Sequence, residues 1–274
     1  MTATAATTTE TRSPDVAPAS VGTGAHLTFG RVVRSEAIKL VSLRSTWWLI
    51  GVAAALSVGI SLLMAAASAD FGPGFPPVMA IVAPMQFTML VAGILGAIAV
   101  TGEYSTGMIR SSLTAVPQRG AVLAAKALVM GLFLAGSSAA IFGLAVVATS
   151  GLLSPQIDWS DAASSTVPIA YGVLSMTAFA LLGVSFGFII RNGAGAIAAT
   201  VGLLFVAPIV VSLFTMFGPA WEWVTDLGQY LPVTASQTLT SVGSEDTGPA
   251  LIALLAWVGA GLLGAWAVLR TRDA

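Results

Sequence analysis

Six long apolar runs divide this sequence, and they restrict its fold more than any other feature. They cover residues 47–68, 78–100, 121–148, 169–190, 194–217 and 249–269. Each can cross a membrane as a helix, because a hydrocarbon core about 30 Å thick needs about 20 helical residues. Lipid offers backbone groups no hydrogen-bonding partner, and the runs lack the alternation of barrel strands. The sequence therefore predicts an all-α integral membrane protein with six transmembrane helices.

Composition supports this class and excludes several kinds of site. Charged residues make up only 8% of the 274 positions, whereas soluble domains carry about 25%. The absence of cysteine excludes disulfide bonds and thiolate metal sites. The sequence Gly-Lys-Ser/Thr of a P-loop does not occur, and the single histidine, His26, precedes the first apolar run. We therefore expect no enzyme, no metal site, no cofactor bound by this chain and no nucleic-acid partner.

The distribution of charge predicts an orientation. If the N-terminus is inside, all 11 Lys and Arg residues fall in cytoplasmic segments. The outer segments then hold no basic residue, and their acidic residues are Asp70, Asp158, Asp161, Glu222, Asp226, Glu245 and Asp246. This bias is typical of the positive-inside rule. We expect a multi-pass protein of the cell (cytoplasmic) membrane with both termini in the cytoplasm.

The region before the first run has two parts. Residues 1–27 are rich in Thr and Ala and lack the apolar core of a signal peptide, which predicts a disordered cytoplasmic tail. Residues 28–274 form the six-span domain, and its first segment, residues 28–45, is predicted to be a helix. Apolar side chains recur there at helical spacing, at Phe29, Val32, Val33, Leu40 and Leu43. Because basic residues fall on the other faces, this helix is expected to lie in the membrane interface.

Glu36 is out of place in that helix, because its position falls within the apolar stripe. An unpaired carboxylate against apolar surface is costly, so Glu36 must either reach water or meet a basic partner. Lys39 is the local candidate, and Lys126 and Arg119 are the distant ones. For Glu103, a pairing with Lys126 or Arg119 is the plainest expectation.

A polar segment between the second and third runs, residues 102–126, is the second informative feature. It is much longer than the usual connection of about 2–8 residues between neighbouring helices. Apolar residues within it predict a short helix from Met108 to Thr114 lying across the loop. Gly107 is expected to end the preceding span. Pro117 suits the first turn of the next one, where a missing N–H costs nothing.

The order of residues in this segment resembles a known family. Glu103, then Ser-Thr-Gly at 105–107, Met-Ile-Arg-Ser-Ser-Leu-Thr at 108–114, Val-Pro-x-Arg at 116–119 and Lys126 are similar to the permease subunits of type-2 ATP-binding-cassette (ABC) exporters. The resemblance extends from Thr28 to the C-terminus. It implies a coupling helix that docks on an ATPase, and a connecting helix at residues 28–45.

The resemblance also implies roles and partners. The loop residues that would couple to the ATPase are Glu103, Gly107, Met108, Ile109, Arg110, Leu113, Pro117, Arg119 and Lys126. The connecting helix would contribute Arg34, Glu36 and Lys39. Two permease copies, expected to be a homodimer, would sit in the lipid bilayer above two separate cytoplasmic ATPase subunits, which would hold ATP and Mg²⁺.

Two further patterns leave alternatives open. In the outer segment at residues 218–248 the resemblance implies two short helices dipping back into the outer leaflet, and a plain interfacial loop fits equally well. Gly259-x-Gly261-x-x-Gly264 matches a dinucleotide fingerprint in letters only, because it lies inside a span with no strand before it. We interpret it, together with Gly183 and Gly187, as close helix–helix contact.

The span interiors indicate how such a protein is driven. They contain no acidic residue, and ionisable residues within the membrane usually mark ion pathways. The drive must therefore come from a partner, which favours an ABC exporter subunit over the alternatives, a secondary transporter or a non-transport scaffold. An uncharged path with Gln86 and Trp257 as weak candidates for substrate contact favours a hydrophobic or amphipathic substrate.

This topology predicts where an introduced cysteine can be labelled. We expect cysteine at Ser160 or Ser244 to react with a membrane-impermeant reagent added outside cells, and cysteine at Ser112 not to react. The chain has no native cysteine, so the labelling carries no background from this protein. Labelling of the Ser112 variant from outside would reject the orientation.

Overall fold

The computed structural model describes residues 28–271, apart from residues 73–74, 110–113 and 115–118. Within that part every regular element is helical. Six helical segments are long and apolar enough to cross a membrane: Arg44–Ala66, Met79–Ser105, Arg119–Thr149, Thr166–Ile190, Gly193–Phe217 and Thr247–Thr271. They coincide with the six predicted runs to within a few residues, apart from Ser105 at the end of the second, and confirm the all-α membrane class.

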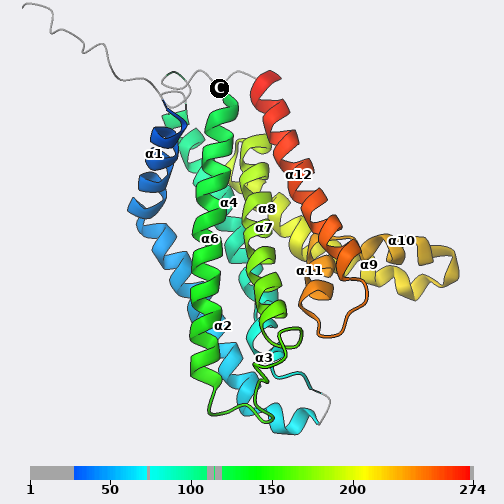
Figure 1. Ribbon diagram of the computed structural model, residues 1–274. Coiled ribbons are helices and arrows are strands. Elements are labelled where there is room, and N and C mark those ends of the chain that lie inside the picture. The colour runs from blue at the N-terminus through cyan, green and yellow to red at the C-terminus, as the bar shows by residue number, and fades with distance from the viewer. Residues whose placement is uncertain (1–27, 73–74, 110–113, 115–118, 272–274) are drawn as a thin grey trace, which may run out of the picture.

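The first helix, α1 (Phe29–Ser42), lies at the same end of the bundle as the last turn of α12 (Thr247–Thr271), as Figure 1 shows. The connection from α4 (Met85–Ser105) to α6 (Arg119–Thr149) is at this end too. We call it the loop end. An extended residue, Leu43, separates α1 from α2 (Arg44–Ala66), so the chain changes direction before it runs the length of the bundle.

Proline interrupts the second span and glycine ends it. The predicted single run is interrupted between α3 (Met79–Val82) and α4, where Pro84 precedes the first residue of α4. Proline lacks the N–H that an uninterrupted helix needs there, and it fits well just before a helix begins. At the other end α4 stops at Ser105, and Gly107 follows with φ +72°. The expectation that Gly107 ends this span is confirmed, because glycine adopts this left-handed conformation without strain.

The fifth span is not one regular α-helix. It consists of α8 (Gly193–Val201), a π-helical segment (Gly202–Val206), α9 (Ala207–Leu213) and a 3₁₀ turn (Phe214–Phe217). The π-helical segment ends just before Pro208, which cannot donate to the preceding turn. Widening of the preceding turn accommodates the missing donor, as π-bulges commonly do.

The segment at residues 218–248 contains two short helices, α10 (Glu222–Gly228) and α11 (Pro232–Thr240). Figure 1 shows both beside the bundle, about halfway along its length. One face of α11 is buried, including Val233, Ala235 and Leu239, which belong to the main hydrophobic core. The pair of short helices is therefore present, and their dipping into the outer leaflet stays a prediction.

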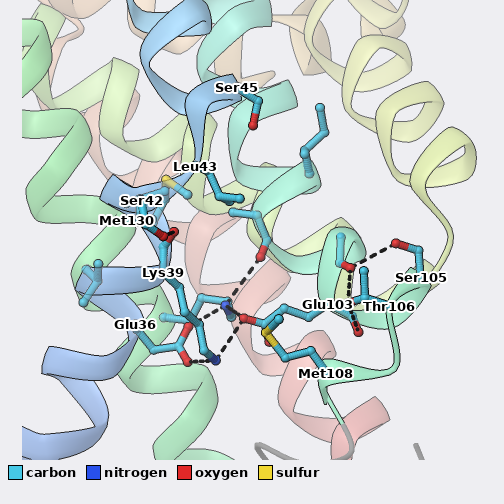
Figure 2. A pocket seen from close by; sticks show the side chains of 16 residues that line it. Glu36, Lys39, Ser42, Leu43, Ser45, Glu103, Ser105, Thr106, Met108 and Met130 are labelled. Atoms are coloured by element: carbon cyan, nitrogen blue, oxygen red, sulfur yellow. Dashed lines mark hydrogen bonds and ion pairs between the residues drawn. The ribbon is translucent and has the colours of Figure 1, made fainter.

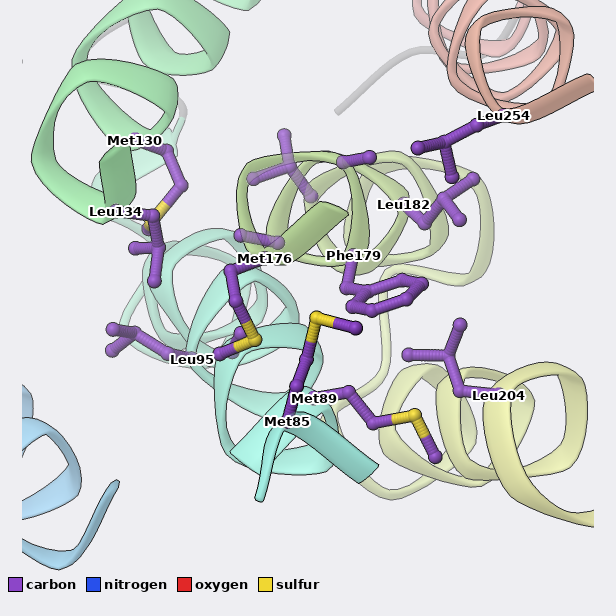
Figure 3. Packing of buried hydrophobic residues seen from close by; sticks show 14 of the residues in the cluster. Met85, Met89, Leu95, Met130, Leu134, Met176, Phe179, Leu182, Leu204 and Leu254 are labelled. Carbon is purple, nitrogen blue, oxygen red and sulfur yellow. The ribbon is translucent and has the colours of Figure 1, made fainter. Parts of the chain in front are cut away.

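The centre of the bundle is the contact between α4 and α7 (Thr166–Ile190), which glycine allows to be very close. A Cβ atom at Gly96 would lie 2.0 Å from the carbonyl oxygen of Ala180, and one at Gly183 would lie 1.9 Å from that of Gly93. Figure 3 shows large apolar side chains filling the space around this contact: Met85, Met89, Leu95, Met130, Leu134, Met176, Phe179, Leu182, Leu204 and Leu254.

Three of the five glycines that the sequence assigned to close helix contacts have that use. A Cβ at Gly187 would lie 2.7 Å from Cβ of Val100, and one at Gly261 would lie 3.0 Å from the Ser185 hydroxyl. Gly264 approaches Ile189 at 3.4 Å, whereas Gly259 has open space beside it. Gly183, Gly187 and Gly261 thus mark close approach of helices, and Gly259 does not.

This packing predicts the cost of a methyl group at the α4–α7 contact. We expect Gly183→Ala to destabilise the protein by about 1–3 kcal/mol, because the clash is with backbone and the helices must separate. Thermal unfolding in detergent measures the loss. Gly136→Ala is the matched control, since nothing lies within 4 Å of its Cβ position and alanine favours a helix. Equal stability of the two variants would contradict the close contact.

Candidate functional site

Four charged side chains from three helices meet at the loop end (Figure 2). Glu36 and Lys39 come from α1, Glu103 from the last turn of α4, and Lys126 from the third turn of α6. We call these four residues the charge cluster. They are up to 90 positions apart in sequence, so the cluster fastens α1 to two membrane-spanning helices.

The ammonium groups bridge the two carboxylates. Lys126 Nζ lies 2.5 Å from Glu36 Oε2 and 2.8 Å from Glu103 Oε1. Lys39 Nζ lies 2.6 Å from Glu36 Oε1 and 3.1 Å from Glu103 Oε1. Lys126 also donates to the carbonyl oxygen of Ala99 at 3.4 Å. Two cations thus share two anions, and the cluster has no net charge when all four groups are ionised.

Because these groups are buried, their pairing matters for the stability of the protein. Glu36, Glu103 and Lys126 are all buried, and only Lys39 remains partly open, with 26% of its side chain exposed. Glu36 lies between Val32 and Leu40 on the face that α1 turns toward the bundle. Removing one partner of a buried ion pair costs about 3–5 kcal/mol, because the other charge stays buried and uncompensated.

The ion pairs shift the pKa values of the two charged residues of α1. Burial by itself raises the pKa of Glu36, but the neighbouring ammonium groups of Lys126 and Lys39 outweigh it and hold the pKa below its ordinary value. Burial lowers the pKa of Lys39, yet the carboxylates of Glu36 and Glu103 raise it above its ordinary value. Both α1 groups are therefore charged throughout the neutral pH range.

The sequence-predicted partners are largely found here. Glu36 meets its local candidate, Lys39, and one of its distant candidates, Lys126. Glu103 pairs with Lys126 as expected. Arg119, the other candidate, donates from Nη1 to the carbonyl oxygen of Leu269 at 2.8 Å.

Arg119 and Arg191 share a structural role that the sequence did not reveal. Arg191 Nη2 donates to the carbonyl oxygen of Val268 at 3.3 Å, and its guanidinium lies 5.4 Å from the ring centroid of Tyr104. The last carbonyl groups of a helix lack partners within it, and cations are favourable at that end. The two arginines thus anchor the end of α12 to α6 and α7. An unsatisfied helix terminus near basic residues is the only sequence signal for this contact.

The loop residues are described in part. Met108, Ile109 and Thr114 are helical, and Ile109 is buried in the main core while the Met108 side chain is 46% exposed. The predicted coupling residues Arg110, Leu113 and Pro117 lie outside the described residues, as does Ser112. The helix expected from Met108 to Thr114 and its coupling role stay predictions.

The remaining candidates do not join the cluster. Arg34 is on the exposed face of α1, and Gln86 is half-buried in the first turn of α4, far along that helix from Glu103. Trp257 donates from its indole nitrogen to the carbonyl oxygen of Tyr230 at 2.9 Å and lines a surface hollow that does not include Gln86. The structure thus does not bring the two weak substrate candidates together.

The chemistry available at this end is electrostatic. In the described ranges no three His, Asp or Glu side chains are placed to hold a metal ion.

A scan against protein-family models and a search of curated proteins gave no match. What the cluster provides is a salt-bridged joint between a peripheral helix and two helices of the bundle.

A double-mutant cycle tests this joint. We expect Lys126→Met to destabilise the protein by about 3–5 kcal/mol, because two buried carboxylates lose their shared ammonium group. Glu36→Gln should lower stability much less in the Lys126→Met background than in the wild type, since it then removes a carboxylate that has already lost Lys126. Arg34→Met, on the exposed face of α1, is the control and should change stability by about 0.5 kcal/mol or less. Additive losses would show that the two helices are not coupled through these charges.

The pH dependence of the same proteins gives a second check. The pKa of Glu36 is lowered, so its contribution is complete above the ordinary value of 4.5 and is lost as pH falls through the lower folded pKa. The pKa of Lys39 is raised, so its contribution is complete below 10.5 and is lost as pH rises through the higher folded pKa. The difference in melting temperature between the wild type and Glu36→Gln should therefore be constant near neutral pH and become smaller in acid.

Proposed function

We propose that this chain is the permease subunit of a type-2 ABC exporter, driven by ATP hydrolysis on a separate ATPase subunit. The observation that carries the proposal is the charge cluster. It joins α1, α4 and α6 at the end of the bundle where the 102–126 segment leaves and re-enters the spans. Glu103 and Lys126 lie near the two ends of this segment, so a force applied to it acts on the cluster.

The lack of charge inside the spans supports an external drive. Among the described residues, the acidic and basic side chains of the six spans are confined to their end regions, at Arg44, Glu103, Arg119, Lys126 and Arg270. Transporters coupled to ions or protons normally place such groups within the membrane. A chain without them needs energy delivered at one end, which is the role of a docked ATPase.

The local packing offers a route for that energy. Ile109 is buried in the same core as Leu40 of α1 and Leu123 of α6. A displacement of the helical residues around Ile109 therefore reaches both helices through packed side chains as well as through Glu103. Packed cores pass on such shifts because they are close-packed and resist compression.

The assembly follows from this role. Two copies of the chain in the cytoplasmic membrane, with the loop end facing the cytoplasm, would bind two ATPase subunits that hold ATP and Mg²⁺. The bundle offers mainly apolar surface along its spans, so the proposed cargo is hydrophobic or amphipathic. Such a compound can enter from the bilayer without a counter-charge at mid-membrane.

A substitution at Met108 tests the docking surface. We expect Met108→Asp to abolish co-purification of ATPase activity from native membranes while membrane insertion is retained, because the exposed apolar side chain is replaced by a charge. The measurement is vanadate-sensitive ATP hydrolysis in affinity-purified material. Leu113→Asp, in the undescribed part of the loop, is expected to act in the same way.

Met108→Leu is the matched control, since it keeps an apolar side chain of similar volume. It should retain the ATPase activity of the wild type. If Met108→Asp and Met108→Leu carry equal ATPase activity, or if the wild type carries none, docking at this loop is wrong.

A further inference from the structure

A cavity of about 350 Å³ lies beside the charge cluster, between α1, α4 and α6 (Figure 2). The four charged residues line one part of it. Most of the remaining wall is apolar, formed by Leu40, Leu43, Ile98, Ala99, Met108, Val129 and Met130. Exposed residues such as Ser45 and Thr106 also line it, so the cavity is open to its surroundings.

One hydrogen-bonding position in the cluster has no partner. Lys126 Nζ has three N–H groups and three acceptors, and each oxygen of Glu36 accepts from a lysine. Glu103 Oε1 accepts from both Lys39 and Lys126, whereas Glu103 Oε2 is buried without any hydrogen bond. Buried polar atoms are rarely left in this state. The Glu103 side chain, only 9% exposed, thus brings an unused acceptor to the cavity wall.

The charges around this acceptor select the kind of donor that fits. The Glu103 carboxylate already faces two ammonium groups, and the cluster as a whole is neutral. A third cation would be repelled by Lys39 and Lys126, while an anion offers no proton to Oε2. A neutral hydroxyl group supplies the donor without adding charge.

We propose that this cavity binds a neutral amphiphile with a free hydroxyl group on a hydrocarbon chain. The hydroxyl donates to Glu103 Oε2, and the chain lies against Ile98 and Met130. Met108 lines the same cavity and is half-exposed. Because Glu103 Oε2 is buried, a side chain beside it must move before the hydroxyl can reach it. Met108, which is unbranched, can do so by changing rotamer. All groups of this site belong to one chain, so binding can be measured on the purified protein without an ATPase partner.

Protection of an introduced cysteine tests the site with a defined probe. Ser45→Cys places the only thiol of the chain at the cavity, and its rate of maleimide labelling is followed in purified protein. We expect 1-decanol to slow labelling at concentrations about tenfold lower than decyl methyl ether, which has a similar chain but no donor. Decylammonium should protect no better than the ether.

Two variants complete the experiment. Glu103→Gln in the Ser45→Cys background should remove the preference for the alcohol over the ether, because the carboxylate acceptor is lost. Ser160→Cys, in the exposed segment before α7, should be labelled at the same rate with and without decanol. Equal protection by alcohol and ether, best protection by decylammonium, or no protection by any probe would each overturn the proposal. If Glu103→Gln fails to fold, the protection of the Ser45→Cys protein by the three probes still tests the proposal.

Discussion

The neutral, buried charge cluster is the interaction on which the loop end depends. Glu36 belongs to a peripheral helix, yet it is as buried as the apolar residues on either side of it. That burial is tolerable only because Lys126 and Lys39 reach its two oxygens. Lys126 in turn requires Glu103, so the position of α1 and the ends of α4 and α6 are set together. None of the three can shift without breaking a buried ion pair.

The bundle beneath the cluster is held in a different way. The α4–α7 contact relies on glycines that let backbones touch, and on methionine, leucine and phenylalanine side chains that fill the space around it (Figure 3). Close packing of small residues is the usual source of helix association in lipid, where burial of apolar surface contributes little. The structure thus combines a rigid α4–α7 pair at its centre with a salt-bridged α1 at one end. Moving α1 away from the bundle requires the free energy of breaking a buried ion pair. Such an arrangement suits a subunit that receives force at the loop end.

Much of the fold could be predicted from the sequence, because lipid leaves an apolar run little choice but to be a helix. Gly107 marked the end of the second span for a plain steric reason, and the need of Glu36 for a partner followed from its place in an apolar stripe. Which partner it takes did not follow, because Arg119 and Lys126 are two turns apart on nearly the same face of α6. That choice depends on how deep α1 sits against the bundle. The contacts of Arg119 and Arg191 with the end of α12 depend likewise on tertiary packing, and the π-helical segment before Pro208 on how the helix relaxes locally.

The central claim is that energy reaches this chain from a docked ATPase, and the composition of the native complex tests it most directly. Native mass spectrometry of the affinity-purified protein, extracted from its own membrane in mild detergent, gives that composition. The account predicts a complex of two copies of this chain with two copies of a nucleotide-hydrolysing subunit. A chain that is isolated alone, or only with subunits that bind no nucleotide, under conditions that keep other membrane complexes intact, would contradict it.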